Sequence, residues 1–129
     1  LRGLPNVILT PHIGGSTEEA QEAIGQFVAN KLRDYVAQGS TMLSVSLPNL
    51  ALDARTGTHR VTHLHHNTPG VLAGINSVFA DHGVNIDGQL LATKGEYGYV
   101  VTDVGTGLAP DVVAQLHQME QTIKLRVLS

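Results

Sequence analysis

The chain has 129 residues, of which 42% are hydrophobic and 15% charged, and no apolar run approaches the ~20 residues of a membrane span, so we expect no membrane insertion. The net charge is -3 and the eight basic residues are scattered, so nucleic acid is not an expected partner. The sequence has no cysteine, which excludes disulfides and thiolate chemistry and fits a cytoplasmic protein.

The first 40 residues predict a strand, a loop and a long helix. Residues 6–10 are a short β-prone run that a proline ends. Ser16 and Glu19 have the spacing of a capping box, so a helix should begin at Thr17. It should continue for about 22 residues to Gly39 with one apolar side that needs a packing partner. That side comprises Ala20, Ile24, Phe27, Val28, Leu32, Tyr35 and Val36.

Residues 41–58 read as a connector between this arm and the rest of the chain. Residues 44–48 are a possible short strand, and residues 53–58 have turn composition without a period. We find no internal repeat and no low-complexity tract. The connector therefore separates two regions that are expected to differ in structure.

The stretch from residue 59 to residue 86 predicts a strand, a tight turn, an amphipathic helix and the start of a second strand. A β-prone run around Val61 and Leu64 leads to Pro69, which suits the first helical position, with Asn67 or Thr68 as the cap. A His-Gly pair then ends the helix. One apolar stripe follows the helical period: Val71, Leu72, Ile75, Val78 and Phe79.

The remaining residues complete a small α+β domain. Even-numbered residues from 84 to 92 should form one face of a strand, with the odd-numbered side mostly polar. A hairpin at 94–96, a strand over 97–104, a helix from about residue 109 and a last strand around 123–127 follow. The order β-α-β-β-α-β predicts a ferredoxin-like fold, with two helices on one face of a four-stranded antiparallel sheet.

Two segments of the sequence resemble one enzyme family. The N-T-P-G-V-L stretch, followed about a dozen residues later by G-V-N-I, resembles the opening of an ACT domain, a small regulatory module that in most cases binds amino acids. Residues 4–21, L-P-N-V-I-L-T-P-H-I-G-G-S-T-E-E-A-Q, resemble the last catalytic segment of the D-3-phosphoglycerate dehydrogenase family. The resemblance implies a catalytic remnant over 1–40, a connector over 41–58 and an ACT regulatory domain over 59–129.

The same resemblance implies roles for a loop before the long helix. His12 matches the histidine that exchanges a proton with the substrate hydroxyl while NAD accepts hydride, a task that suits a pKa near neutrality. His12, Ile13, Gly14 and Gly15 would contact the cofactor. Without the resemblance, this segment is an ordinary loop histidine followed by two turn glycines.

The chain by itself is expected to be catalytically inactive. The family needs a substrate-binding arginine, a glutamate and a G-x-G-x-x-G dinucleotide fingerprint, and none of them is present here. The chain also starts with Leu1, without a signal peptide, which suggests a fragment. The parent implied by the resemblance oxidises 3-phosphoglycerate to 3-phosphohydroxypyruvate with NAD, the first step of L-serine biosynthesis, and this chain is its C-terminal third.

His65, Asn67 and Asn85 match the residues that contact serine in serine-inhibited members of the family. The alternative is that they are polar groups of turns and edge strands. Amide side chains offer both donors and acceptors to an amino acid, and the start of the following helix adds N–H groups for its carboxylate. The resemblance therefore implies L-serine or another small amino acid as effector. ACT domains commonly pair edge to edge, so we expect a homodimer, and a higher homo-oligomer in the parent.

Two further readings remain open from the sequence. Five of the seven histidines lie between residues 59 and 82, but we expect no metal site, since cysteine is absent and nearby acids are not at ligand spacing. The alternative function is a free-standing ACT-type sensor or dimerisation module without catalysis. The sequence upstream of Leu1 would separate that alternative from a dehydrogenase.

Overall fold

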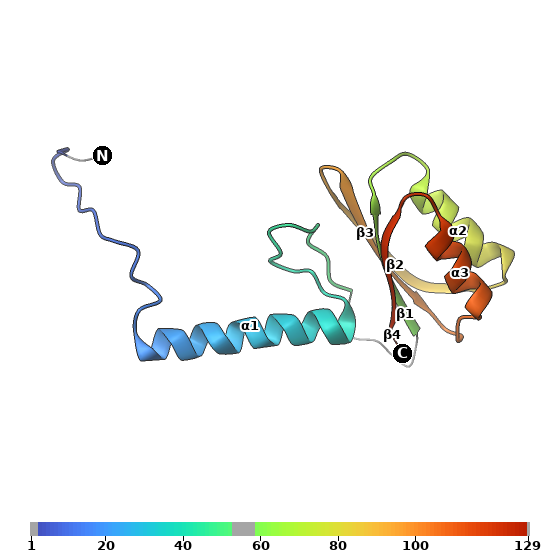
Figure 1. The fold of residues 1–129 in the computed structure, drawn as a ribbon, viewed down its shortest axis with the longest axis horizontal. Helices are drawn as coiled ribbons and strands as arrows, with labels where there is room; N and C mark the ends of the chain where they lie inside the picture. Colours follow the sequence, from blue (N-terminus) through green and yellow to red (C-terminus); the bar gives the residue numbers. More distant parts are fainter. Residues whose placement is uncertain (1–2, 53–58, 129) are drawn as a thin grey trace. The chain divides into compact units, whose positions relative to one another are not determined.

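The computed structural model describes residues 3–52 and 59–128. They fall into two compact units, residues 1–32 and 33–129, and the boundary lies inside the first helix. No helix among the described residues is long and apolar enough to cross a membrane. The elements in chain order are α1 (Glu18–Gln38), β1 (His59–His66), α2 (Val71–Asp81), β2 (Ile86–Lys94), β3 (Tyr97–Val104), α3 (Pro110–Gln118) and β4 (Thr122–Leu128) (Figure 1).

The strand predicted over residues 6–10 is absent, so that prediction is wrong. Asn6 adopts a positive φ of 62°, which breaks an extended backbone, and no strand among the described residues of this unit offers a partner. A β-prone run needs a neighbouring strand to satisfy its backbone groups. The segment before α1 is therefore irregular and exposed along nearly all of its length.

Helix α1 forms as predicted, with its cap one residue later than expected. The Thr17 hydroxyl accepts a hydrogen bond from the Ala20 N–H at 3.1 Å, so Thr17 is the cap. The Ser16 N–H instead donates to the Ile13 carbonyl at 3.0 Å in the preceding turn. No residue of α1 is buried, and its apolar side is largely exposed: Ile24, Phe27, Val28, Leu32 and Val36.

Residues 59–128 form the predicted βαββαβ fold. The sheet has the strand order β2-β3-β1-β4, and all three pairs are antiparallel. Helices α2 and α3 cover one face of it (Figure 1). The core between the helices and the sheet contains Val61, Val71, Ile75, Phe79, Val100, Val104, Val112, Leu116 and Leu125. The apolar stripes read from the sequence therefore face this core.

The other face of the sheet is covered by part of the predicted connector. Leu50 is buried against Tyr99 and Val101. Thr41 closes the loop, because its N–H donates to the Leu50 carbonyl at 2.8 Å and its hydroxyl to the Pro48 carbonyl at 2.6 Å. Since these bonds make a loop, the strand predicted over 44–48 is not formed. The turn predicted over residues 53–58 lies outside the described residues.

Strand β2 does not keep the alternation expected from the sequence. A bulge between Ile86 and Gly88 places Asp87 out of register with β3. Ile86 packs on the helix-covered core, but after the bulge this face carries odd-numbered residues, as the bond from Gln89 to Thr102 shows. One inserted residue reverses the alternation of the whole strand, so the prediction of an even-numbered face is wrong beyond Ile86.

Candidate functional site

The turn between β1 and α2 leaves the start of a helix uncapped. Gly70 occupies the cap position with a φ of 85°, a conformation that favours glycine, and no side chain caps the helix. The prediction that Pro69 begins the helix, capped by Asn67 or Thr68, is therefore wrong. The first bond of the turn runs from the Gly74 N–H to the Gly70 carbonyl at 2.9 Å, so the N–H groups of residues 71–73 have no intrahelical acceptor. Such a helix start attracts an anion.

His65, at the end of β1, is buried rather than exposed. Its side chain is 2% exposed and faces the helix-covered side of the sheet. Nδ1 lies 2.8 Å from the His66 carbonyl, whereas Nε2 is buried and meets no hydrogen-bond partner among the described residues. Gly98 makes room for the ring, since a Cβ there would lie 2.2 Å from His65 Cε1. Sequence reasoning missed Gly98, although a glycine inside a strand often marks such a close approach.

Asn67 and Asn85 are both exposed and lie at opposite ends of α2. The Asn67 side chain donates to the Gly95 carbonyl at 3.1 Å, which ties the turn to the β2–β3 hairpin. The Asn85 amide reaches Asp87 at 3.4 Å just before β2. An α2 of 11 residues is ~16 Å long. One protomer therefore brings His65 and Asn67 together and leaves Asn85 apart.

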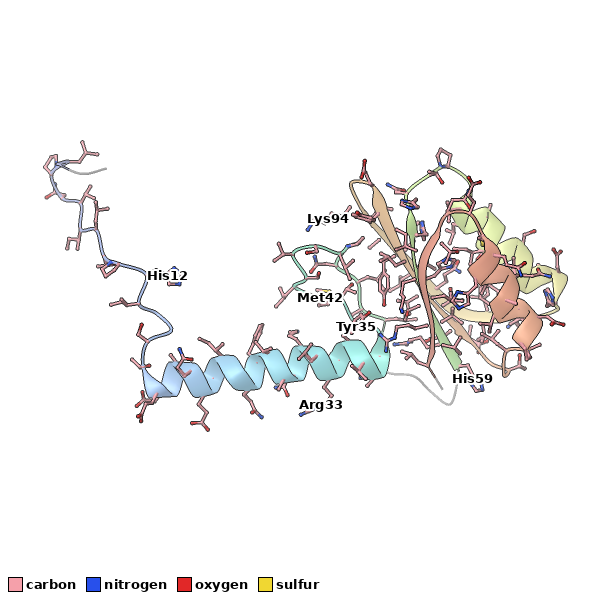
Figure 2. The ribbon with its side chains drawn as sticks, viewed as in Figure 1. His12, Arg33, Tyr35, Met42, His59 and Lys94 are labelled. Atoms are coloured by element: carbon pink, nitrogen blue, oxygen red, sulfur yellow. The ribbon has the colours of Figure 1, made fainter. Side chains whose placement is uncertain are left out.

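The segment from His12 to Gly15 precedes α1 (Figure 2). His12 is exposed, and Ile13 is 58% exposed. The Gln21 side chain donates to the Gly15 carbonyl, which ties this segment to the first turn of α1. No atom lies within 4 Å of a Cβ built on Gly14, so the loop is open on that side.

The other groups of polar side chains are weaker candidates for a functional site. Across residues 3–52 and 59–128, no three histidine or acidic side chains gather in a way that fits a metal ion. His66, Thr68, Pro69, Glu120 and Gln121 line a shallow, open hollow beside the β1–α2 turn. Burial lowers the pKa of His63 to about 4, with smaller contributions from His65 and His117, so this ring stays neutral at neutral pH.

Residues 61–124 match the family model described as the AHAS small subunit-like ACT domain. The chain contains an ACT domain. This match agrees with the βαββαβ order and with helices on one face of an antiparallel sheet. The fold predicted for residues 59–129 is therefore confirmed for the described part of the ACT domain.

Three relatives match nearly the whole chain and not only its ACT domain. The chain is 48% identical to D-3-phosphoglycerate dehydrogenase of Haemophilus influenzae over 128 residues, which is 99% of the chain and 31% of that protein. It is 46% identical to the enzyme of that name from Escherichia coli K12 over 95% of the chain and 30% of that protein, and 41% to that of Dictyostelium discoideum over 99% and 31%. The chain thus spans about a third of these relatives, and the resemblance read from the ACT domain and the P-H-I-G-G segment is confirmed.

A solved structure, the ligand-free regulatory subunit of aspartate kinase from Thermus thermophilus, matches 55% of this chain and 52% of that chain at 19% identity. Its TM-score is 0.43. A likeness this weak adds nothing to the assignment of the ACT domain, which rests on the family match and the topology of the sheet.

Proposed function

We propose that the chain is the C-terminal part of an NAD-dependent D-3-phosphoglycerate dehydrogenase, which oxidises 3-phosphoglycerate to 3-phosphohydroxypyruvate at the start of L-serine biosynthesis. The observation that carries the proposal is the identity of 41–48% to dehydrogenases of that name over 95–99% of the chain, which includes both the P-H-I-G-G segment and the ACT domain. A free-standing sensor would need only the ACT domain. The parent enzyme would work in the cytoplasm.

His12 would be the general acid/base of that reaction. An imidazole suits proton exchange with a substrate hydroxyl because its ordinary pKa lies near neutral pH. His12 is exposed, so its ring is accessible to a domain that supplies NAD. Ile13, Gly14 and Gly15 would lie along the nicotinamide end of the cofactor.

The ACT domain would bind L-serine at the β1–α2 turn. The uncapped N–H groups of residues 71–73 suit the carboxylate of an amino acid. His65 Nε2 is an acceptor without a partner among the described residues, and it suits a hydrogen-bond donor of the ligand, either directly or through a water molecule. Asn67 and Asn85 supply amides that pair with either charged end. These hydrogen-bond donors and acceptors therefore complement the carboxylate and the ammonium group of a small amino acid.

The site would be shared by two protomers. The α2 helix separates Asn85 from His65 and Asn67 by ~16 Å, which is longer than one small amino acid. A two-fold axis that sets Asn85 of one chain beside His65 and Asn67 of another would create two equivalent sites. Serine would then stabilise the homodimer, because it binds only the associated state.

Titration calorimetry with L-serine tests this proposal. Asn85→Ala should weaken binding by about 1 to 3 kcal/mol, since a charged end of the ligand loses a partner. Gln115→Ala, which removes an exposed amide on α3, is the matched control and should bind as the wild type does. Serine heat that survives Asn85→Ala unchanged would refute the shared site.

A mixing experiment separates a shared site from a site within one protomer. Asn85→Ala and Asn67→Ala chains are each expected to bind serine weakly. Because each site takes Asn85 from one chain and Asn67 from the other, a mixed dimer contains one intact site and one doubly altered site. Serine binding should therefore return on mixing, to about half of the wild-type capacity in each mixed dimer and about a quarter over all dimers at full random exchange. No recovery in mixed dimers confirmed by mass spectrometry would contradict the shared site.

A further inference from the structure

Two buried histidines lie side by side on the helix-covered face of β1. His63 and His65 are each 2% exposed. Their ring centroids are 5.8 Å apart and the ring planes meet at 85°. His63 pairs across the sheet with Val100 and His65 with Gly98, so the backbone of β3 lies next to both rings.

The hydrogen bonds of these rings define which nitrogen of each carries the proton. The Thr122 hydroxyl donates to the Leu116 carbonyl at 2.7 Å, so it accepts from His63 Nε2 at 2.8 Å. His65 Nδ1 lies 2.8 Å from the His66 carbonyl, which can only accept. Each neutral ring therefore has its remaining nitrogen free as an acceptor. These acceptors are His63 Nδ1 and His65 Nε2.

Both acceptors are buried, and no described residue donates a hydrogen bond to either of them. A buried polar atom without a partner costs ~1–3 kcal/mol. A metal ion fits poorly, because the described residues add no third ligand. An ammonium ion would lose its hydration in exchange for only two neutral acceptors. One water molecule supplies two O–H donors, which equals the number of free lone pairs.

We propose that His63 and His65 hold one water molecule between them inside the protomer, and that through this water His63 makes the effector site prefer an amino acid with a side-chain hydroxyl. A water that donates both protons to the two rings keeps its oxygen lone pairs as acceptors. An effector hydroxyl can donate to that oxygen, whereas a methyl group in its place leaves the oxygen unpaired. A site built to pair a hydroxyl rejects the analogue without it.

This inference rests on the proposed function, because it concerns the same effector site. It adds His63 as a positioning residue, which acts through the water and His65 and does not touch the ligand. The two histidines lead directly into the turn before α2, whose first N–H groups are those that attract the carboxylate.

The first experiment uses the ligand-free 129-residue chain. Nitrogen-15 NMR of the imidazole rings should show His63 protonated at Nε2 and His65 at Nδ1, and cross-relaxation should connect their ring protons to a bound water. Detection of the reversed tautomers, or of no long-lived water, would overturn the inference. Neither result depends on an effector.

The second experiment compares L-serine and L-alanine by calorimetry in wild type, His63→Leu and His63→Gln. Wild type should prefer serine. His63→Leu should lose ~3- to 10-fold in serine affinity, the value of one hydrogen bond, while alanine affinity stays unchanged. His63→Gln should restore the preference, since its amide can donate to Thr122 and accept from the water. Circular dichroism checks that the variants are folded.

The outcomes separate the inference from the proposed function. Serine binding with an unchanged serine-to-alanine ratio in folded His63→Leu would overturn the role of His63 and leave the proposed function intact. An equal loss for both ligands would show a purely structural role and would also overturn it. Absence of serine binding to the wild-type chain, at concentrations where it is dimeric, would overturn both proposals.

Discussion

His63 makes the stability of the ACT domain dependent on pH. Burial lowers its pKa from 6.5 to about 4 in the folded chain, so the unfolded chain binds a proton first as the pH falls. Stability from this group is complete above pH 6.5 and is lost progressively down to about pH 4. We expect a loss of about 3 kcal/mol across that window, from 1.36 kcal/mol per pKa unit.

Urea denaturation between pH 7.5 and pH 4.5 measures this effect, with His63→Gln as the reference. Glutamine fills much of the same volume and does not titrate, so the difference between the two proteins isolates His63 from other histidines. The wild-type curve should fall more steeply below pH 6.5. Parallel curves for the two proteins would show that the folded and unfolded states bind the His63 proton equally well.

Gly98 is expected to tolerate no side chain. A Cβ at Gly98 would lie 2.2 Å from His65 Cε1 and 2.7 Å from Nε2, so the buried ring or the backbone of β3 would have to move. Gly98→Ala should destabilise the chain by about 1–3 kcal/mol, as overpacking does, and should weaken serine binding through His65. Gly88→Ala is the matched control in the same sheet, because its nearest atom lies at 3.8 Å. Equal thermal stability of the two variants would contradict this role of Gly98.

At the scale of elements, the sheet holds the end of α1. Arg126 of β4 donates to the carbonyls of Tyr35 at 3.2 Å and Val36 at 3.0 Å, and its guanidinium lies 4.6 Å from the Tyr35 ring. Tyr99 donates to the Gly39 carbonyl at 2.6 Å. These donors satisfy carbonyls that a helix end leaves free.

Arg126→Lys should loosen this helix end without unfolding the ACT domain. Lysine keeps the charge but lacks the planar fork that reaches two carbonyls. Amide hydrogen exchange over residues 33–40 should accelerate, while exchange in β1 and β3 stays slow. Lys124→Gln, at an exposed position of the same strand, serves as the control and should leave these amides unchanged. Unaltered exchange in Arg126→Lys would mean that the helix end does not depend on the arginine fork.

Hydrophobic patterning was sufficient to predict that α1, α2, α3 and the four strands of the sheet exist, because most of these elements carry one continuous apolar face. It failed where a single residue or a distant partner decides the structure. The bulge at Asp87 depends on pairing with β3, and the run at 6–10 lacked a strand to pair with. Gly70 is the cap residue of α2, because the Asn67 side chain instead donates a hydrogen bond to the β2–β3 hairpin.

The candidate site shows the same limit. His65, Asn67 and Asn85 were identified through a family motif, and pattern alone reads them as turn polar groups. The burial of His65 and the room left by Gly98 depend on the register of β1 with β3, which no local window of sequence contains. The tautomer of His63 depends on Thr122, which lies 59 residues away.

At the scale of the whole molecule, the edge strands β2 and β4 are the two candidate surfaces through which copies of the chain can pair. Leu91 on β2 is 42% exposed and Ile123 on β4 is 40% exposed, so both edges offer similar apolar surface. The proposed shared site favours the β2 edge, because Asn85 leads directly into β2. A lysine on the edge that pairs should prevent association.

Sedimentation equilibrium at tens of micromolar tests this with a matched pair of variants. Wild type and Ile123→Lys should sediment as dimers, with association strengthened by L-serine. Leu91→Lys should sediment as a species of about the chain mass, 13.7 kDa, with and without serine. A dimeric Leu91→Lys and a monomeric Ile123→Lys would place the interface on β4 and exclude the shared site.

The loop that covers the far face of the sheet limits how this domain can be transplanted. Regulatory modules are attractive parts for grafting onto other enzymes, and the family match, residues 61–124, invites a cut just before β1. Such a cut would uncover Tyr99 and Val101, which now pack against Leu50, and would remove the carbonyls that the buried Arg60 holds at Gln38 and Leu52. A transplantable domain should therefore start near residue 33. A chimera that omits residues 33–52 would expose the apolar face of the sheet at Tyr99 and Val101.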